Sequence, residues 1–138
     1  MEALKELIET KRQEGYRPAL VMDANEDYTK PKRDQDLRDF ILATGLVDHF
    51  KDKFPAPIRT FICGSKRLDY ILVDPGLVDA IEIIGYLDSH EGAYTDHVYA
   101  YVDFAEEKLF RGLINRPVPL HSREFMLAQT DKKLAFQK

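Results

Sequence analysis

The hydrophobic period of the chain changes near Ile58, and this change constrains the fold more than any other feature. Before it, apolar residues recur at helical spacing in segment 2–14 and again up to residue 45. After it, apolar runs of strand length follow at 59–63, 67–73, 79–86 and 95–104. Strands flanked by helices predict an α+β fold with a mainly antiparallel sheet and helices on one face.

Local signals set the expected limits of these elements. Gly15 ends the first helix, and Asp34 or Asp36 caps a second helix that closes near Gly45. After Pro18, the apolar run 19–22 is typical of a buried strand. The runs 59–63 and 67–73 flank a Gly-Ser-Lys turn, which predicts a hairpin.

Length and charge favour one domain with an appended segment. The chain has 138 residues and a net charge of −4, and a domain of this size buries roughly 68% of its unfolded surface, enough for a single core. Residues 1–103 hold 13 basic and 20 acidic side chains, whereas 104–138 hold 7 and 4. We therefore expect a domain at 1–104 and a basic, partly helical extension at 105–138.

Composition also excludes several classes of protein. No apolar stretch approaches the roughly 20 residues that span a bilayer, and the N-terminus lacks the apolar core of a secretory signal. Cys63 is the single cysteine, which excludes an intramolecular disulfide and a multi-cysteine zinc site. We expect an intracellular protein, cytoplasmic or nuclear, that is not secreted and does not bind membranes.

Three acidic groups of residues occur at the ends of predicted strands or within them. They are Asp23 with Asn25, Asp69 within a Leu-Asp-Tyr-Ile-Leu run, and Asp96 with His97. Strand ends are where a rigid sheet presents catalytic groups. For Asp23, a turn or helix-capping carboxylate is the alternative interpretation.

Asp69 is the least ordinary of these carboxylates. By strand alternation it shares a face with Ile71 and Val73, so a buried or half-buried carboxylate there needs a partner. His97 is the candidate, because an aspartate can hold one imidazole nitrogen and leave the other free for acid/base chemistry or for stabilising an anion.

Three motifs together resemble those of a known superfamily. In order they are Val-Met-Asp-Ala-Asn-Glu at 21–26, Arg-Leu-Asp-Tyr-Ile-Leu at 67–72 and Thr-Asp-His at 95–97. They are similar to the three C-terminal motifs of the endonuclease/exonuclease/phosphatase superfamily, and 45–48 followed by 59–61 is similar to the segment between the first two. Met22, Ala24 and Thr95 depart from the usual residues, and none of these changes removes a chemical group.

The resemblance implies roles for five residues. His97 would stabilise the phosphorane or contact the scissile phosphate, with Asp69 orienting its ring. Asp23 would position or deprotonate the attacking water, and Asn25 would donate to a phosphate oxygen. Asp96 would help bind Mg²⁺ or Mn²⁺, the cofactor that the resemblance implies. The implied activity is metal-dependent phosphodiester hydrolysis, of nucleic acid in the leading interpretation.

The resemblance covers only the second half of the family fold, a four-layer αββα sandwich. The metal-binding Glu and an active-site Asn of the first half have no counterpart in this chain. We therefore expect weak Mg²⁺ binding, with Glu26 or Asp27 as possible replacements for the missing ligand. Half a sandwich would also pair with a second copy or with a separate first half, and the alternative to an active enzyme is an inactive fragment that needs such a partner.

Two further readings follow from the resemblance. A phosphatase acting on a small phosphorylated ligand or a lipid would use the same residues. In mobile-element polyproteins an endonuclease of this superfamily is followed by a polymerase, and the basic segment after residue 104 resembles a piece of such a polyprotein.

Overall fold

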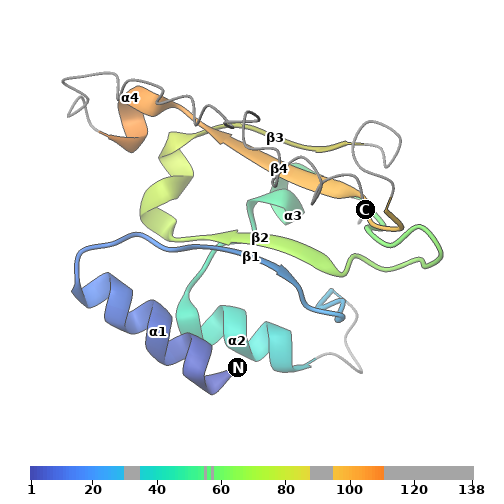
Figure 1. Ribbon diagram of the computed structural model, residues 1–138, viewed down its shortest axis with the longest axis horizontal. Helices are drawn as coiled ribbons and strands as arrows, with labels where there is room; N and C mark the ends of the chain where they lie inside the picture. Colours follow the sequence, from blue (N-terminus) through green and yellow to red (C-terminus); the bar gives the residue numbers. More distant parts are fainter. Residues whose placement is uncertain (30–34, 55, 57, 88–94, 111–138) are drawn as a thin grey trace, which may run out of the picture.

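The computed structural model describes residues 1–29, 35–54, 56, 58–87 and 95–110. Figure 1 shows their arrangement, with the helices α1 and α2 below a first pair of strands and a second pair above it. In chain order the elements are α1 (Glu2–Gln13), β1 (Ala19–Asp23), α2 (Gln35–Thr44), α3 (His49–Lys53), β2 (Asp69–Val73), the 3-10 helix η1 (Pro75–Ala80), β3 (Ile81–Leu87), β4 (Tyr99–Phe104) and α4 (Glu106–Leu109).

The described strands form two antiparallel pairs, β1 with β2 and β3 with β4. In the first pair Val21 lies opposite Ile71 and Asp23 lies opposite Asp69. In the second pair the register shifts between Ile81 and Ile83, which marks a bulge. This mixture of helices and antiparallel strands confirms the α+β class predicted from the sequence.

The first core lies between the two long helices and the lower face of the β1–β2 pair, and we call it the helix-side cluster. Helical spacing brings Leu37 and Phe40 of α2 onto this sheet, and both are fully buried. Its buried members are Ile8, Leu37, Phe40, Leu46, Tyr70 and Leu72.

A second core, which we call the strand-side cluster, covers the opposite face of β2. Because side chains alternate along a strand, β2 contributes Tyr70 and Leu72 to one core and Ile71 and Val73 to the other. The buried members of the strand-side cluster are Phe50, Ile71, Val73 and Ile84. The β3–β4 pair and α3 therefore cover β2 from above (Figure 1).

The β1 strand was correctly predicted, but the prediction that it is buried is wrong. Its residues alternate between exposed and half-buried, and Val21 is 73% exposed. Leu20 and Met22 pack on the helix-side cluster. Val21 points to the other face, where the strand-side cluster covers β2 but not β1.

Both helices end as the sequence predicts, but the second begins with a different cap. Gly15 and Gly45 have positive φ angles of 89° and 62°, which favour glycine at a helix end. The N–H of Leu37 in the first turn of α2 donates to the carboxylate of Glu26 at 3.0 Å. Of the two caps predicted, Asp36 lies inside the first turn, and Asp34 lies outside the described residues.

The predicted hairpin of 59–63 with 67–73 is wrong. Only β2 forms there, and segment 59–63 contributes an isolated bridge between Phe61 and His97. The main chain of 60–62 pairs with the segment that leads into β4, where Ile62 N–H donates to Asp96 O at 2.8 Å. The Gly-Ser-Lys turn is therefore a loop between a bridging segment and a strand.

The described chain reaches only the first residues of the expected extension. The helix α4 follows β4 directly, and the predicted extension beyond residue 110 lies outside the described residues. Among the helices that are described, none has the length and apolar content needed to cross a membrane.

Candidate active site

Asp23 and Asp69 lie at the same register position on neighbouring strands. Two hydrogen bonds of 2.8 Å flank the β1–β2 ladder, from Ala24 N–H to Leu68 O and from Asp74 N–H to Pro18 O. They show which opposite residues form hydrogen-bonded pairs. By alternation the Asp23–Asp69 pair is a non-hydrogen-bonded pair, in which side chains approach most closely. The sheet therefore holds two carboxylates side by side at its end.

His97 completes this cluster from the segment that leads into β4. Its Nδ1 lies 2.9 Å from Asp69 Oδ2, so His97, the candidate partner, is in contact with Asp69. One ligand atom from each of Asp23, Asp69 and His97 lies within 4.8 Å of the others. With Nδ1 held by Asp69, the second ring nitrogen, Nε2, remains for a ligand.

The electrostatics of the cluster favour a protonated imidazole. The hydrogen bond to Asp69 raises the pKa of His97 above 6.5, partial burial opposes this, and the negative charges of Asp69, Asp23 and Asp96 add to the increase. Two like charges directly opposite on adjacent strands are unfavourable. A positive group between them, an imidazolium or a cation, therefore stabilises the arrangement.

The structure places the other two predicted residues at the rim of the cluster. The N–H of Asn25 donates to Asp23 Oδ1 at 3.0 Å, and Asn25 has a φ of 54°. This tight turn holds Asp23 and Asn25 in place at the end of β1. Asp96 is exposed and is not one of the three clustered groups, although its charge reaches His97.

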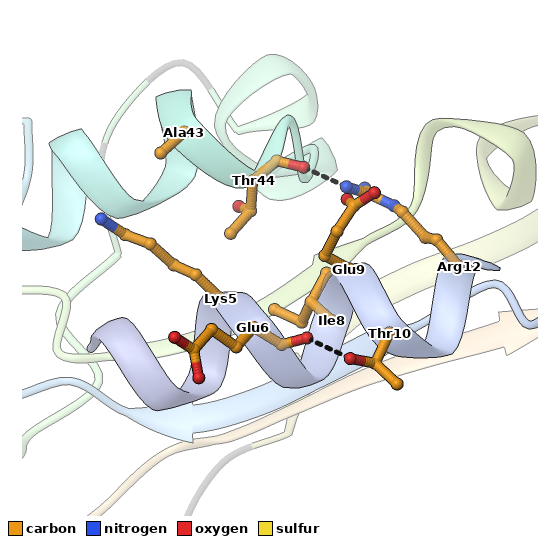
Figure 2. Close-up of a pocket in the computed structure, with 8 residues that line it drawn as sticks. All are labelled: Lys5, Glu6, Ile8, Glu9, Thr10, Arg12, Ala43 and Thr44. Atoms are coloured by element: carbon orange, nitrogen blue, oxygen red, sulfur yellow. Dashed lines mark hydrogen bonds between the residues drawn. The ribbon is translucent and has the colours of Figure 1, made fainter. Parts of the chain in front are cut away.

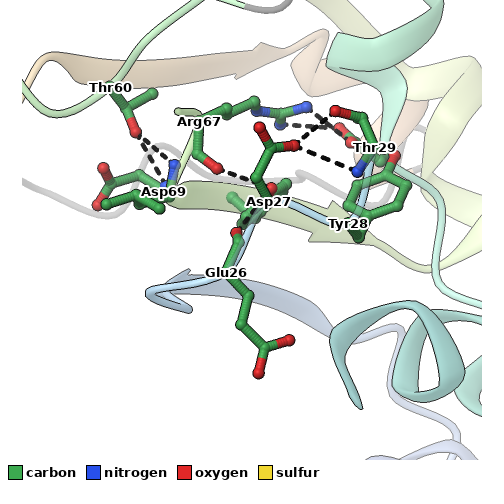
Figure 3. Close-up of polar contacts among 10 residues, drawn as sticks. Glu26, Asp27, Tyr28, Thr29, Thr60, Arg67 and Asp69 are labelled. Carbon is green, nitrogen blue, oxygen red and sulfur yellow. Dashed lines mark hydrogen bonds and ion pairs between the residues drawn. The ribbon is translucent and has the colours of Figure 1, made fainter. Parts of the chain in front are cut away.

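The two acidic residues that could have replaced a missing metal ligand are used elsewhere. Glu26 bonds to the N-terminus of α2, and Asp27 is buried and accepts a hydrogen bond from Thr29 N–H at 3.2 Å. Figure 3 shows both residues and Asp69 with the polar contacts around them. Neither belongs to the acidic cluster.

A buried ion pair anchors the loop that leads into β2. Arg67 donates through two nitrogens to Asp48, at 2.7 and 2.9 Å, and Tyr28 donates to the same carboxylate at 2.7 Å. Burial opposes the charge of Arg67, but the hydrogen bonds to Asp48 raise its pKa above the usual value. Burial and the same carboxylate raise the pKa of Tyr28, so its hydroxyl stays a donor.

Tyr70 links this ion pair to the cluster. Its hydroxyl lies 2.9 Å from the carbonyl of Arg67 and 3.0 Å from that of Glu26, and the guanidinium of Arg67 stands 4.5 Å from the centre of its ring. Arg67 thus packs on the ring of Tyr70, the residue that follows Asp69. The Arg-x-Asp-Tyr motif positions Asp69, and its arginine takes no part in the acidic cluster.

A hollow of about 550 Å³ lies on the helix side of the molecule. Figure 2 shows it between α1 and α2, where Lys5 and Glu9 line it and Arg12 donates to the carbonyl of Thr44. The side chains of Asp23 and Asp69 point to the other face of the sheet. The hollow is therefore separate from the acidic cluster.

Comparison with known proteins adds nothing to this geometry, since no family model, no curated protein and no solved structure matches the chain.

Sequence reasoning missed one contributor to the site, Thr60, which is fully buried beside Asp69. Its only signal was its place in the segment between the first two motifs.

Proposed function

We propose that the acidic cluster is a phosphodiester hydrolysis site of the endonuclease/exonuclease/phosphatase kind. The observation that carries the proposal is the Asp23–Asp69–His97 cluster, in which Asp69 holds Nδ1 of the imidazole. An aspartate-oriented imidazole beside a second, exposed carboxylate is suited to move a proton and to stabilise developing negative charge.

The residues divide the chemistry between them. A water oxygen forms a bond to phosphorus while the bond to the leaving oxygen breaks. The proton of that water passes to the Asp23 carboxylate, and the leaving oxygen takes a proton from solvent. Protonated His97 donates from Nε2 to a phosphate oxygen as charge builds there, and Asp69 keeps the ring in this orientation.

The donor set is suited to a hard divalent cation. Asp69 uses Oδ2 for His97 and has a second oxygen, and Asp23 adds a carboxylate at the same register position. Mg²⁺ or Mn²⁺ bound by these oxygens would supply charge stabilisation to the phosphate. With only two clustered carboxylates, we propose that this binding is weak.

Nucleic acid is the substrate class we propose. Asp23 and Asp96 are exposed, so the cluster is accessible to a polymer lying across the end of the sheet. The net charge of −4 gives little non-specific attraction for a polyanion. Binding would therefore depend on the cation.

Nicking of supercoiled plasmid by the purified chain tests this function. We expect nicking with Mg²⁺ or Mn²⁺ that a chelator abolishes and that falls about 10²- to 10⁴-fold in His97→Ala. His49→Ala is the matched control, since His49 lies in α3 outside the cluster. Equal background nicking by wild type and His97→Ala would refute the proposal.

A second set of reactions separates the substrate classes. Bis(p-nitrophenyl) phosphate reports diester hydrolysis, and p-nitrophenyl phosphate reports monoester hydrolysis. A wild type that hydrolyses only the monoester and leaves plasmid intact, with the monoester activity lost in His97→Ala, would favour the alternative of a phosphatase acting on a small ligand.

The exposed face and edge of β1 support a second candidate function, an association module. Val21 is 73% exposed, and the N–H and C=O groups of Ala19, Val21 and Asp23 point away from β2, since these residues occupy non-hydrogen-bonded positions. We propose that a second polypeptide adds a strand here, as exposed edges favour. Monomeric sedimentation at high concentration, without binding of an apolar dye, would count against it.

A further inference from the structure

Thr60 has the environment of a core residue although it lies outside the helices and strands. Its exposed fraction is 0%, and Asp69 lies beside it (Figure 3). A hydroxyl group buried this completely must form hydrogen bonds to offset its desolvation.

The Thr60 hydroxyl holds the chain where β2 begins. Its Oγ1 accepts from Leu68 N–H at 2.8 Å and from Asp69 N–H at 3.0 Å. Asp69 occupies a non-hydrogen-bonded position opposite Asp23, so its N–H points away from β1 and needs an acceptor elsewhere. Thr60 supplies that acceptor, and no strand does so among the described residues.

The main chain of Thr60 holds the segment that carries His97. Its carbonyl accepts from Val98 N–H at 2.7 Å, and two residues later Ile62 N–H donates to Asp96 O at 2.8 Å. These bonds fall on the two neighbours of His97. The ring of Phe61, between them in sequence, stands 5.4 Å from the imidazole.

We propose that Thr60 is the positioning residue of the Asp69–His97 pair. It is one buried residue whose hydroxyl accepts from the backbone of Asp69 and whose carbonyl accepts from the backbone of Val98, the residue after His97. Loss of the hydroxyl frees the Asp69 backbone, while the bridge to His97 stays. The Asp69 carboxylate and the His97 imidazole then shift relative to each other, since only the Asp69 side of the connection depends on Oγ1.

The catalytic consequence rests on the proposed hydrolysis, but the positioning itself does not. Both hydrogen bonds use Oγ1 as an acceptor. Thr60→Val therefore removes them at nearly constant volume, and Thr60→Ser retains them. Thr44→Val is the matched control, because Thr44 is also buried and its hydroxyl donates to Phe40 O at 2.8 Å on the helix side.

Nuclear magnetic resonance on the full chain at fixed pH is the first measurement. In Thr60→Val we expect at least about tenfold faster amide exchange at Asp69 and a displaced imidazole Nδ1 signal at His97. Thr60→Ser should restore both, and Thr44→Val should change neither. Unchanged signals in Thr60→Val, or equal changes in Thr44→Val, would overturn the proposal.

Kinetics on the same proteins give the second measurement. If wild type hydrolyses phosphodiesters, Thr60→Val should lower kcat about 10- to 100-fold with KM nearly constant, because the pair is misplaced and not removed. A wild type without activity would refute the proposed function and leave the resonance test intact. If Thr60→Val does not fold, Thr60→Cys, with a weak sulfur acceptor, replaces it and is judged by the same outcomes.

Discussion

Two carboxylates at one register position repel each other, and Asp23 with Asp69 is such a pair. They can lie together because protonated His97 supplies a positive charge that offsets their repulsion. The bond from Nδ1 to Asp69 is 2.9 Å long, and it is the main reason that the pKa of His97 is raised. The same contact that orients the ring therefore also favours its protonated form.

Asp69→Asn should lower the pKa of His97 toward 6.5, because it removes the largest cause of the increase. The pKa is raised in the folded state, so protonation of His97 stabilises the fold fully below about pH 6.5. This stabilisation disappears as pH rises through the folded-state pKa. Titration of the imidazole by nuclear magnetic resonance measures the shift.

Asp96→Asn is the control for this titration, since the charge of Asp96 has the smallest effect on the pKa of His97 among the causes given above. It should lower the pKa of His97 less than Asp69→Asn does. An equal or larger decrease would show that the orienting bond is not the main cause.

Arg67→Ala should destabilise the protein by about 3–5 kcal/mol, because it leaves the Asp48 carboxylate buried without its cation. Both side chains of this pair are almost fully buried. Urea denaturation measures the change in the free energy of unfolding. Lys11→Ala, which breaks an exposed pair with Glu14, is the control and should cost less than about 1 kcal/mol.

At the scale of elements, Asp74 joins α1 to the end of β2. Its carboxylate accepts from Arg12 at 2.8 Å, from Arg17 at 3.1 Å and from the Gly76 N–H at 2.9 Å. Burial alone would raise the pKa of Asp74, but these three donors lower it below 3.8. One side chain thus fixes the C-terminal end of α1, the start of β1 and the first turn of η1.

Asp74→Asn should destabilise the protein by about 1.5–3 kcal/mol at pH 7, the usual contribution of hydrogen bonds to a charged group. The pKa is lowered in the folded state, so the ionised carboxylate stabilises the fold above about pH 4. That stabilisation is lost as pH falls through the folded-state pKa.

Urea denaturation at pH 7 and pH 3 measures the free energy of unfolding. The difference in this free energy between wild type and Asp74→Asn should be smaller at pH 3 than at pH 7. Asp39→Asn, at an exposed position of α2, is the control and should change little at either pH. A constant difference for Asp74→Asn would contradict the assigned ionic contacts.

The elements that the sequence predicted well are those whose signals are local. Helical spacing and a following glycine were sufficient for α1 and α2, and alternation along β2 indicated that Asp69 needs a partner, for which the chemistry of the side chains suggested His97. The hairpin failed because Phe61 bridges to His97, a partner 36 residues away in the sequence. The roles of Thr60 and of the Glu26 cap depend on tertiary contacts, and apart from the place of Thr60 in the segment between the first two motifs no sequence signal pointed to them.

At the scale of the whole molecule, β2 is the element that both cores share. Leu72 is fully buried in the helix-side cluster, and its neighbour Val73 is almost fully buried in the strand-side cluster. Neither core has enough surface to be stable alone, since two-stranded sheets need further packing. The acidic cluster lies at the end of the β1–β2 pair and is held in place from both sides.

Leu72→Ala should therefore weaken both cores together, with a loss of about 2–5 kcal/mol in the free energy of unfolding. Native-state amide exchange should show protection falling equally in α2, which packs on Leu72, and in β4, which lies beyond β2. Val21→Ala is the control, because Val21 is 73% exposed. If β4 kept its protection while α2 lost it, the two cores would be independent units, and the cluster would bridge two parts that open separately.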